Sequence, residues 1–124
     1  MKDLVFGLCM SEGISGNENK AAEFALEKLK EYAKAERLPN GSVVACLGNE
    51  NANKRILLDA HIDQVGFVVT DIDDKGFIKF ASCGGNDRRI MPGSVVRVFG
   101  KEEVIGQISA QENGNDIEIR DIGW

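Results

Sequence analysis

Apolar positions in the first third of the chain recur at helical spacing. The run Leu4–Met10 predicts a short apolar helix. A longer helix is predicted from a cap at Asn17 to about Glu36, because small and apolar side chains return to one face while charged ones stay on the other. The residues of this buried face are Ala22, Leu26, Leu29 and Ala33.

Two short apolar runs follow a turn at residues 39–41. Ser42–Leu47 and Ile56–Ala60 are predicted to be β-strands, separated by the polar loop GNENANK. The second run begins with three apolar residues that do not alternate with polar ones, which is typical of a strand buried on both faces of a parallel sheet. The first 64 residues therefore predict an α/β arrangement.

The pattern changes after Gln64. Short apolar runs are now separated by glycine-, asparagine- and aspartate-rich turns at the spacing of about ten residues that small barrels and sandwiches show. The predicted strands are Val65–Asp71, Phe77–Phe80, Val95–Phe99, Val104–Ser109 and Ile117–Arg120. The acidic stretch Asp71–Gly76 is interpreted as a hairpin turn, since Lys75 stands at the fifth position of a would-be calcium-binding loop and Ser82 at the twelfth, where a bidentate glutamate is required. These features place a domain boundary at about Gln64.

Composition and charge exclude several classes of protein. With 43% apolar residues, 28% charged residues and a net charge of -5, the 124-residue chain suits a folded domain and lacks the basic surface that a nucleic-acid-binding protein needs. No apolar run approaches the ~20 residues of a membrane helix. Three cysteines, Cys9, Cys46 and Cys83, are far apart and lie among apolar or small residues, which predicts buried, reduced thiols and a cytoplasmic protein.

The single histidine, His61, follows the second apolar run in the segment ILLDAHIDQVGFVV. In an extended segment, residues i and i+2 face the same side, so His61 and Asp63 are expected to point together. An imidazole that binds a metal through one nitrogen usually donates its other N–H to a carboxylate or carbonyl. His-x-Asp therefore indicates a metal ligand with its orienting partner, although a histidine at a strand end is also commonly an ordinary hydrogen-bonded residue.

Four stretches, in this order and spacing, resemble the tetrahedral or glutamyl aminopeptidases. They are SEGISGNENKAAEFALEKL, LPNGSVVA, LLDAHIDQVGFVVT and DDKGFIKFASCGGNDRRIMPGSVVRV. The resemblance runs from residue 1 to about Ile108. Members of this dizinc exopeptidase family have often been labelled cellulase or endoglucanase.

The resemblance implies roles for particular residues. His61 matches the family's first metal-binding histidine, and Asp63 matches the catalytic-site aspartate that orients it, while Gln64 stands where the family usually has glutamate. It also implies the N-terminal part of a zinc-exopeptidase-like α/β catalytic domain in residues 1–64. Residues 65–124 would then form a β-rich, barrel-like insertion used for dimerisation.

What the resemblance implies about function is limited by what the chain contains. The family cleaves N-terminal residues from peptides with two divalent metal ions, zinc or cobalt, but its remaining ligands and its general-base glutamate lie downstream of any matching segment here. The chain is therefore interpreted as a fragment or shortened relative that alone is inactive and binds no metal tightly, and that forms homo-oligomers through its β-rich half. The alternatives are a non-catalytic β-domain that binds subunits or other proteins, and a glycosidase, as the older labels suggest. The residues that would bind substrate are not predicted.

Overall fold

The computed structural model describes residues 1–49, 51–110 and 117–121. The chain divides into two compact units, residues 1–64 and residues 65–124. Each unit is described by itself.

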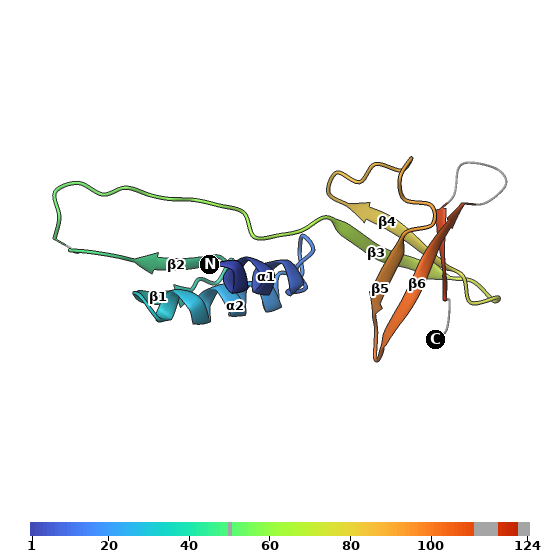
Figure 1. The fold of residues 1–124 in the computed structure, drawn as a ribbon, viewed down its shortest axis with the longest axis horizontal. Coiled ribbons are helices and arrows are strands. Elements are labelled where there is room, and N and C mark those ends of the chain that lie inside the picture. The colour runs from blue at the N-terminus through green and yellow to red at the C-terminus, as the bar shows by residue number, and fades with distance from the viewer. Residues whose placement is uncertain (50, 111–116, 122–124) are drawn as a thin grey trace. The chain divides into compact units, whose positions relative to one another are not determined.

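The first unit is built from two helices and a two-stranded antiparallel hairpin (Figure 1). Its elements are α1 (Lys2–Met10), α2 (Asn19–Lys30), β1 (Lys34–Arg37) and β2 (Val43–Cys46). Helix α2 packs against both strands of the hairpin and against α1. Ala21 and Ala22 of α2 are buried, so the close contacts of this unit are made by small side chains.

The long predicted helix is shorter than its pattern suggested. Glu18, and not Asn17, is the N-cap of α2, and the helix ends at Lys30 instead of continuing to Glu36. Residues 34–37 form β1, in which Lys34 pairs with Cys46 and Arg37 with Val43. This pairing satisfies backbone groups that a helix would otherwise satisfy, and tertiary pairing of this kind overrides a weak local helix preference.

The predicted strand Ile56–Ala60 is wrong for the described structure, and so is the parallel sheet that it would have begun. Residues 54–63 are extended but belong to no strand, and β2 pairs antiparallel with β1. Ile56, Leu57 and Leu58 are 88%, 86% and 90% exposed. A strand exists only where a second strand supplies hydrogen-bonding partners, and no segment in the described part of the chain pairs with this one.

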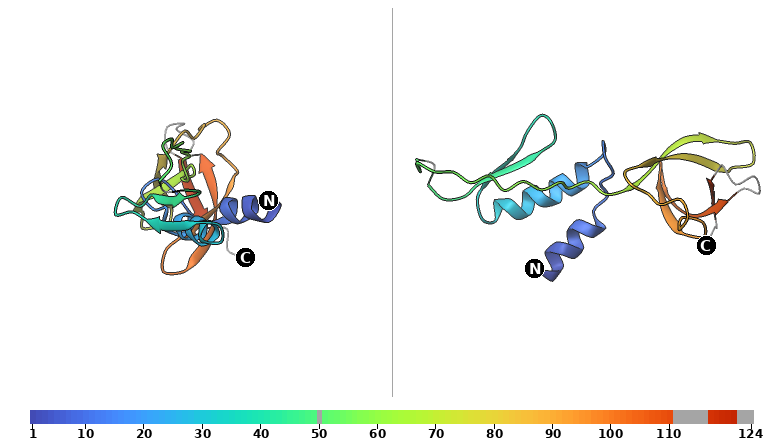
Figure 2. Two further views of the ribbon diagram at one scale, coloured as in Figure 1. Left: turned by 90° about the vertical axis from the view of Figure 1, so that its left-hand side faces the viewer. Right: turned by 90° about the horizontal axis from the view of Figure 1, so that it is seen from above.

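The second unit is one antiparallel sheet in the order β3-β4-β7-β6-β5. Its strands are β3 (Gly66–Ile72), β4 (Ile78–Cys83), β5 (Val95–Phe99), β6 (Glu103–Ala110) and β7 (Ile117–Asp121). All five predicted strands are therefore present, with ends that differ by a few residues. Figure 2 shows that the sheet is strongly curved. The described strands form an open sheet whose edges are β3 and β5, and not a closed barrel.

The hairpin turn predicted between β3 and β4 is confirmed. The Asp73 carboxylate accepts hydrogen bonds from the backbone N–H groups of Lys75 and Phe77, both at 2.9 Å. Gly76 has a φ of +85°, a conformation that glycine adopts without the steric cost that a side chain adds. The acidic side chain that begins this loop therefore caps a turn.

The core of the second unit forms around Met91 and Ile108, which are 6% and 2% exposed. Side chains from β3, β4 and β5 pack against this pair because the curved sheet brings both of its edges toward one cluster. They are Phe67, Ile78, Phe80, Val96 and Val98. The rings of Phe67 and Phe80 meet edge to face at 4.7 Å.

The three cysteines are free, but the prediction that all are buried is wrong. Cys9 and Cys46 are exposed and Cys83 is half-buried. Cys46 alternates with half-buried neighbours on β2, so its apolar sequence context marks a strand with one exposed face. Among the described residues, no helix is long and apolar enough to cross a membrane.

Candidate metal centre

His61 and Asp63 lie together at the end of the extended segment 54–63, as their i, i+2 spacing predicts. His61 Nδ1 is 3.0 Å from Asp63 Oδ1. The imidazole is 86% exposed, whereas the aspartate side chain is 36% exposed. Because Nδ1 faces the carboxylate, Nε2 on the opposite side of the ring is the nitrogen that is free to bind a metal ion.

A third residue, Ser15, completes this group. Ser15 Oγ donates a hydrogen bond of 2.5 Å to Asp63 Oδ2, the oxygen that does not contact His61. The Ser15 hydroxyl lowers the pKa of Asp63 below its usual value, and the hydrogen bond from His61 lowers it further. Sequence reasoning missed Ser15, which is 48 residues from Asp63 and carries no spacing signal that links the two.

The loop that carries Ser15 is held from both sides. The Gln64 N–H donates to the Gly13 carbonyl at 2.6 Å, and Ile14 forms a parallel bridge with Gln64. Gly13 is buried against α2, where a Cβ would stand 3.0 Å from the Cβ of Ala21. The Asn17 N–H closes the turn on the Ile14 carbonyl at 2.8 Å. These contacts place Ser15 beside Asp63.

The Gln64 side chain joins the same segment to the end of α1. Its Nε2 donates to the carbonyls of Ser11 and Leu8 at 3.0 and 3.2 Å and approaches that of Cys9 at 3.5 Å. The last carbonyls of a helix lack partners within the helix, so an amide donor stabilises them. A glutamate, which the resemblance led us to expect here, has no donor for these oxygens when ionised. The hydrogen bonds to these carbonyls therefore explain why glutamine suits this position.

The donor set fits one part of a metal site. An exposed imidazole held by an ionised carboxylate is the usual arrangement of a metal-binding histidine and its outer partner. Among the described residues, no group of three or more histidine, cysteine, aspartate or glutamate side chains gathers to hold a metal ion. The chain thus offers one candidate metal ligand, His61, with Asp63 held against its Nδ1.

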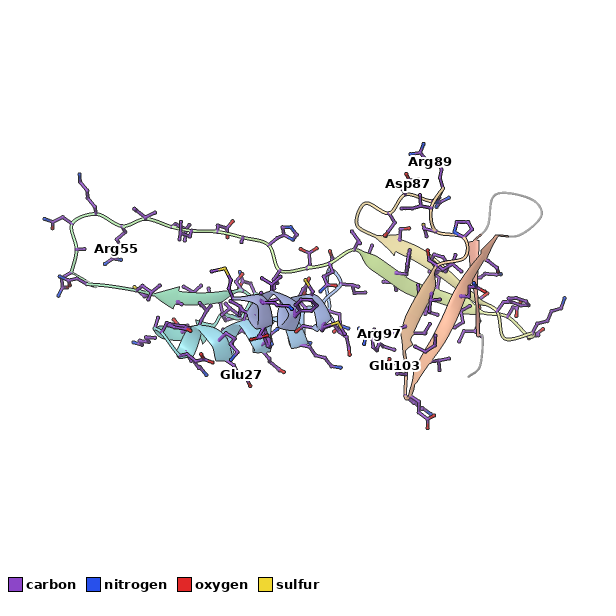
Figure 3. The ribbon with its side chains drawn as sticks, viewed as in Figure 1. Glu27, Arg55, Asp87, Arg89, Arg97 and Glu103 are labelled. Atoms are coloured by element: carbon purple, nitrogen blue, oxygen red, sulfur yellow. The ribbon has the colours of Figure 1, made fainter. Side chains whose placement is uncertain are left out.

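Two further ion pairs, both in the second unit, lie at the surface (Figure 3). After β4, Arg89 Nε and Nη2 contact the two carboxylate oxygens of Asp87 at 3.0 and 2.7 Å, and this guanidinium lowers the pKa of Asp87. Arg97 of β5 and Glu103 of β6 lie 3.9 Å apart. Exposed pairs of this kind contribute little to stability.

The chain matches a family model over residues 41–116, and that model describes the M42 glutamyl aminopeptidases. The matched range includes His61, Asp63 and most of the second unit. It covers more than half of the chain.

Two curated proteins that carry aminopeptidase names are similar to the chain. One from Acetivibrio thermocellus is 35% identical over 107 residues, which are 86% of this chain and 31% of that protein. The other, SgcX of Escherichia coli strain K12, is 36% identical over 113 residues, which are 87% of this chain and 30% of that protein. The chain therefore spans about a third of the length of these relatives.

Solved structures are similar over nearly the whole chain. A TET aminopeptidase from a marine-sediment Thaumarchaeota archaeon has 28% identity and a TM-score of 0.83, covering 98% of this chain and 38% of that one. The Pyrococcus horikoshii TET1 peptidase, described as assembling into a tetrahedron or a large octahedral shell, has 27% identity and a TM-score of 0.80 over 98% of this chain and 40% of its own. A Thermotoga maritima protein named endoglucanase has 31% identity and a TM-score of 0.77 over 90% of this chain and 36% of its own.

Proposed function

Because this chain belongs to the M42 glutamyl aminopeptidase family, we propose that it is the N-terminal part of a metal-dependent enzyme that removes residues from the N-termini of peptides. The observation that carries the proposal is the His61–Asp63 contact of 3.0 Å inside the region that matches the family. The relatives' aminopeptidase names favour this function over a separate protein-binding β-domain. We do not propose a glycosidase. One similar structure is named endoglucanase, but the two curated relatives and the TET structure carry aminopeptidase names.

In the proposed site, His61 binds a divalent metal ion through Nε2. Asp63 accepts a hydrogen bond from Nδ1–H, which keeps the ring proton on Nδ1, leaves Nε2 unprotonated and fixes the direction of its lone pair. When bound, the family's two ions, zinc or cobalt, supply Lewis-acid activation of the scissile carbonyl and of water. This chain's contribution is to hold one ligand in place.

The rest of the proposed site comes from sequence that is not present in these 124 residues. The described residues gather no further ligands around His61, and the relatives are about three times as long, since the chain covers only 31% and 30% of them. We therefore propose that the chain alone binds metal weakly and does not hydrolyse peptides.

Residues 1–64 are proposed as part of the α/β catalytic domain and residues 65–124 as the β-rich, barrel-like insertion. We propose that this second part mediates homo-oligomerisation, since the similar structures include a dodecamer and a shell-forming peptidase. Two features of this unit support the proposal. Strands β3 and β5 are edges of the described sheet, and the outer face of β5 exposes Val95 and Phe99 at 63% and 50%.

A cytoplasmic location is part of the same proposal. It is supported by the three free cysteines, two of which are exposed. Exposed thiols that stay unpaired are typical of a reducing compartment.

The proposal is tested with the intact polypeptide that contains this sequence. We expect release of N-terminal residues from aminoacyl chromogenic substrates to depend on zinc or cobalt and to fall by more than about 100-fold in His61→Ala, while Asp63→Asn costs about 10- to 100-fold. Glu27→Gln, at an exposed position of α2, is the matched control and should keep full activity. Metal-independent turnover, or full activity in His61→Ala, would exclude the proposed site.

A further inference from the structure

We infer that Ser15 is a positioning residue for His61, which it orients through Asp63. The inference concerns the geometry of the imidazole in the chain as it stands. Its consequence for metal affinity rests on the proposed function.

The Asp63 carboxylate divides its two oxygens between two partners. Oδ1 lies 3.0 Å from His61 Nδ1, and Oδ2 lies 2.5 Å from Ser15 Oγ. An ionised carboxylate only accepts hydrogen bonds, so both the hydroxyl and the imidazole nitrogen must donate. With Oδ2 held by Ser15, the carboxylate cannot rotate freely, and Oδ1 remains aimed at Nδ1–H.

His61 and Asp63 need such an anchor because they are accessible to water. The imidazole is 86% exposed, and an exposed pair of ionisable side chains gains little from its contact while losing side-chain entropy. A donor on a fixed backbone reduces the number of orientations that the carboxylate can adopt. Ser15 meets this need, because its loop is tied to Gln64 on one side and packed on α2 through Gly13 on the other.

A serine in front of a helix commonly caps it, but Ser15 does not cap α2. The N-cap of α2 is Glu18, and no side chain makes a capping hydrogen bond there. The Glu18 carboxylate instead accepts from the Gly16 N–H at 2.6 Å. The hydroxyl of Ser15 is therefore directed at Asp63, 48 residues away, and not at its own helix.

The chain's single histidine makes a direct test possible. The chain is labelled with 15N-histidine. Long-range proton–nitrogen correlation spectra, recorded at a pH above the usual titration range of imidazole, report which ring nitrogen carries the proton. We expect the Nδ1–H tautomer to predominate in the unaltered chain and in Ser15→Thr, which keeps a hydroxyl. In Ser15→Ala we expect a clear shift toward the Nε2–H tautomer.

Ser11→Ala is the matched control, because it removes a hydroxyl that bonds to the Gly7 carbonyl in the same unit without touching Asp63. It should leave the tautomer unchanged. An equal tautomer shift in Ser11→Ala would show a general loosening of the unit and overturn the inference. So would an Nδ1–H tautomer that persists in Ser15→Ala, or one that is absent from the unaltered chain.

A zinc titration of the same samples separates this inference from the proposed function. We expect Ser15→Ala to weaken zinc binding by about threefold to tenfold, less than the roughly 10- to 100-fold loss that removal of a direct partner of a ligand causes, and Ser15→Thr to restore it. If zinc does not bind through His61 but the tautomer still follows the Ser15 hydroxyl, the proposed function fails while the inference stands. If zinc binds through His61 with the same affinity and tautomer in Ser15→Ala, the inference fails alone.

Discussion

The two units of the chain differ in how far they bury their apolar side chains. The second unit pairs five strands with one another and encloses Met91 and Ile108 in a core of its own. The first unit buries mainly alanines, and its most apolar run, Ile56–Leu58, is almost fully exposed. The unit with the candidate chemistry thus carries an apolar run that is more exposed than the described apolar side chains of the β-sheet.

This difference shows that the candidate site forms without burial of the apolar run that precedes it. The Ser15–Asp63–His61 group needs only the short contacts of loop 13–17 and Gln64, all of which are present. Burial of Ile56–Leu58 would need a further layer of structure, because an apolar run of this kind is stable when both of its faces are covered. The candidate ligand His61 is therefore held by its neighbours although the apolar run that precedes it is exposed.

The largest expected effect is a loss of stability when the core of the second unit is truncated. Ile108→Ala should lower the free energy of unfolding of the second unit by about 2–5 kcal/mol, since Ile108 is only 2% exposed. Leu57→Ala, which truncates a side chain that is 86% exposed, should change stability by no more than about 0.5 kcal/mol. Urea denaturation followed through backbone amide signals assigns each transition to its unit. Equal losses in the two variants would mean that Leu57 is covered in solution.

The next effect concerns self-association through the β unit. We expect Phe99→Glu to weaken association at least tenfold, about 1.4 kcal/mol, because a charge would replace an exposed ring on edge strand β5. A charge at Phe80 would not be a clean test of association, because this side chain packs against the core of the unit.

Light scattering at micromolar concentration measures the association. Lys101→Glu, at the exposed turn between β5 and β6, is the control for added negative charge. A concentration-independent mass near 13.5 kDa for the unaltered chain would contradict the oligomer proposal.

A smaller effect is expected at the join between α1 and the candidate site. Gln64→Glu should destabilise the last turn of α1 by about 1 kcal/mol, because it removes the donor for the carbonyls of Leu8 and Ser11. It also places a negative charge at the negative end of the helix dipole. Hydrogen exchange of the amides in that turn measures the loss. Gln107→Glu, which removes a similar bond to the Gly93 carbonyl in the other unit, should leave α1 unchanged.

How far sequence reasoning reached also differs between the units. In the β unit, apolar runs and turn residues predicted all five strands, because hairpin pairing is mostly local in sequence. In the first unit, the same kind of pattern placed residues 34–36 in a helix and residues 56–60 in a strand. Both errors have one cause: whether a segment pairs with another strand depends on the presence of a partner, which local periodicity does not reveal.

The candidate site divides in the same way. The proximity of His61 and Asp63 follows from their spacing of two residues in extended backbone. The roles of Ser15 and Gln64 do not, because Ser15 contacts a residue 48 positions away and Gln64 contacts carbonyls 53 to 56 positions away. Contacts of this range depend on the fold around the loop at residues 13–17.

The central claim is that these residues supply one ligand and its support, and not a working active site. The most direct measurement is turnover of aminoacyl chromogenic substrates by the purified 124-residue chain with added zinc or cobalt. We predict no hydrolysis above the rate of a metal-only blank. Metal-dependent hydrolysis by this chain that disappears in His61→Ala would contradict the claim and would show that these residues complete the site by themselves.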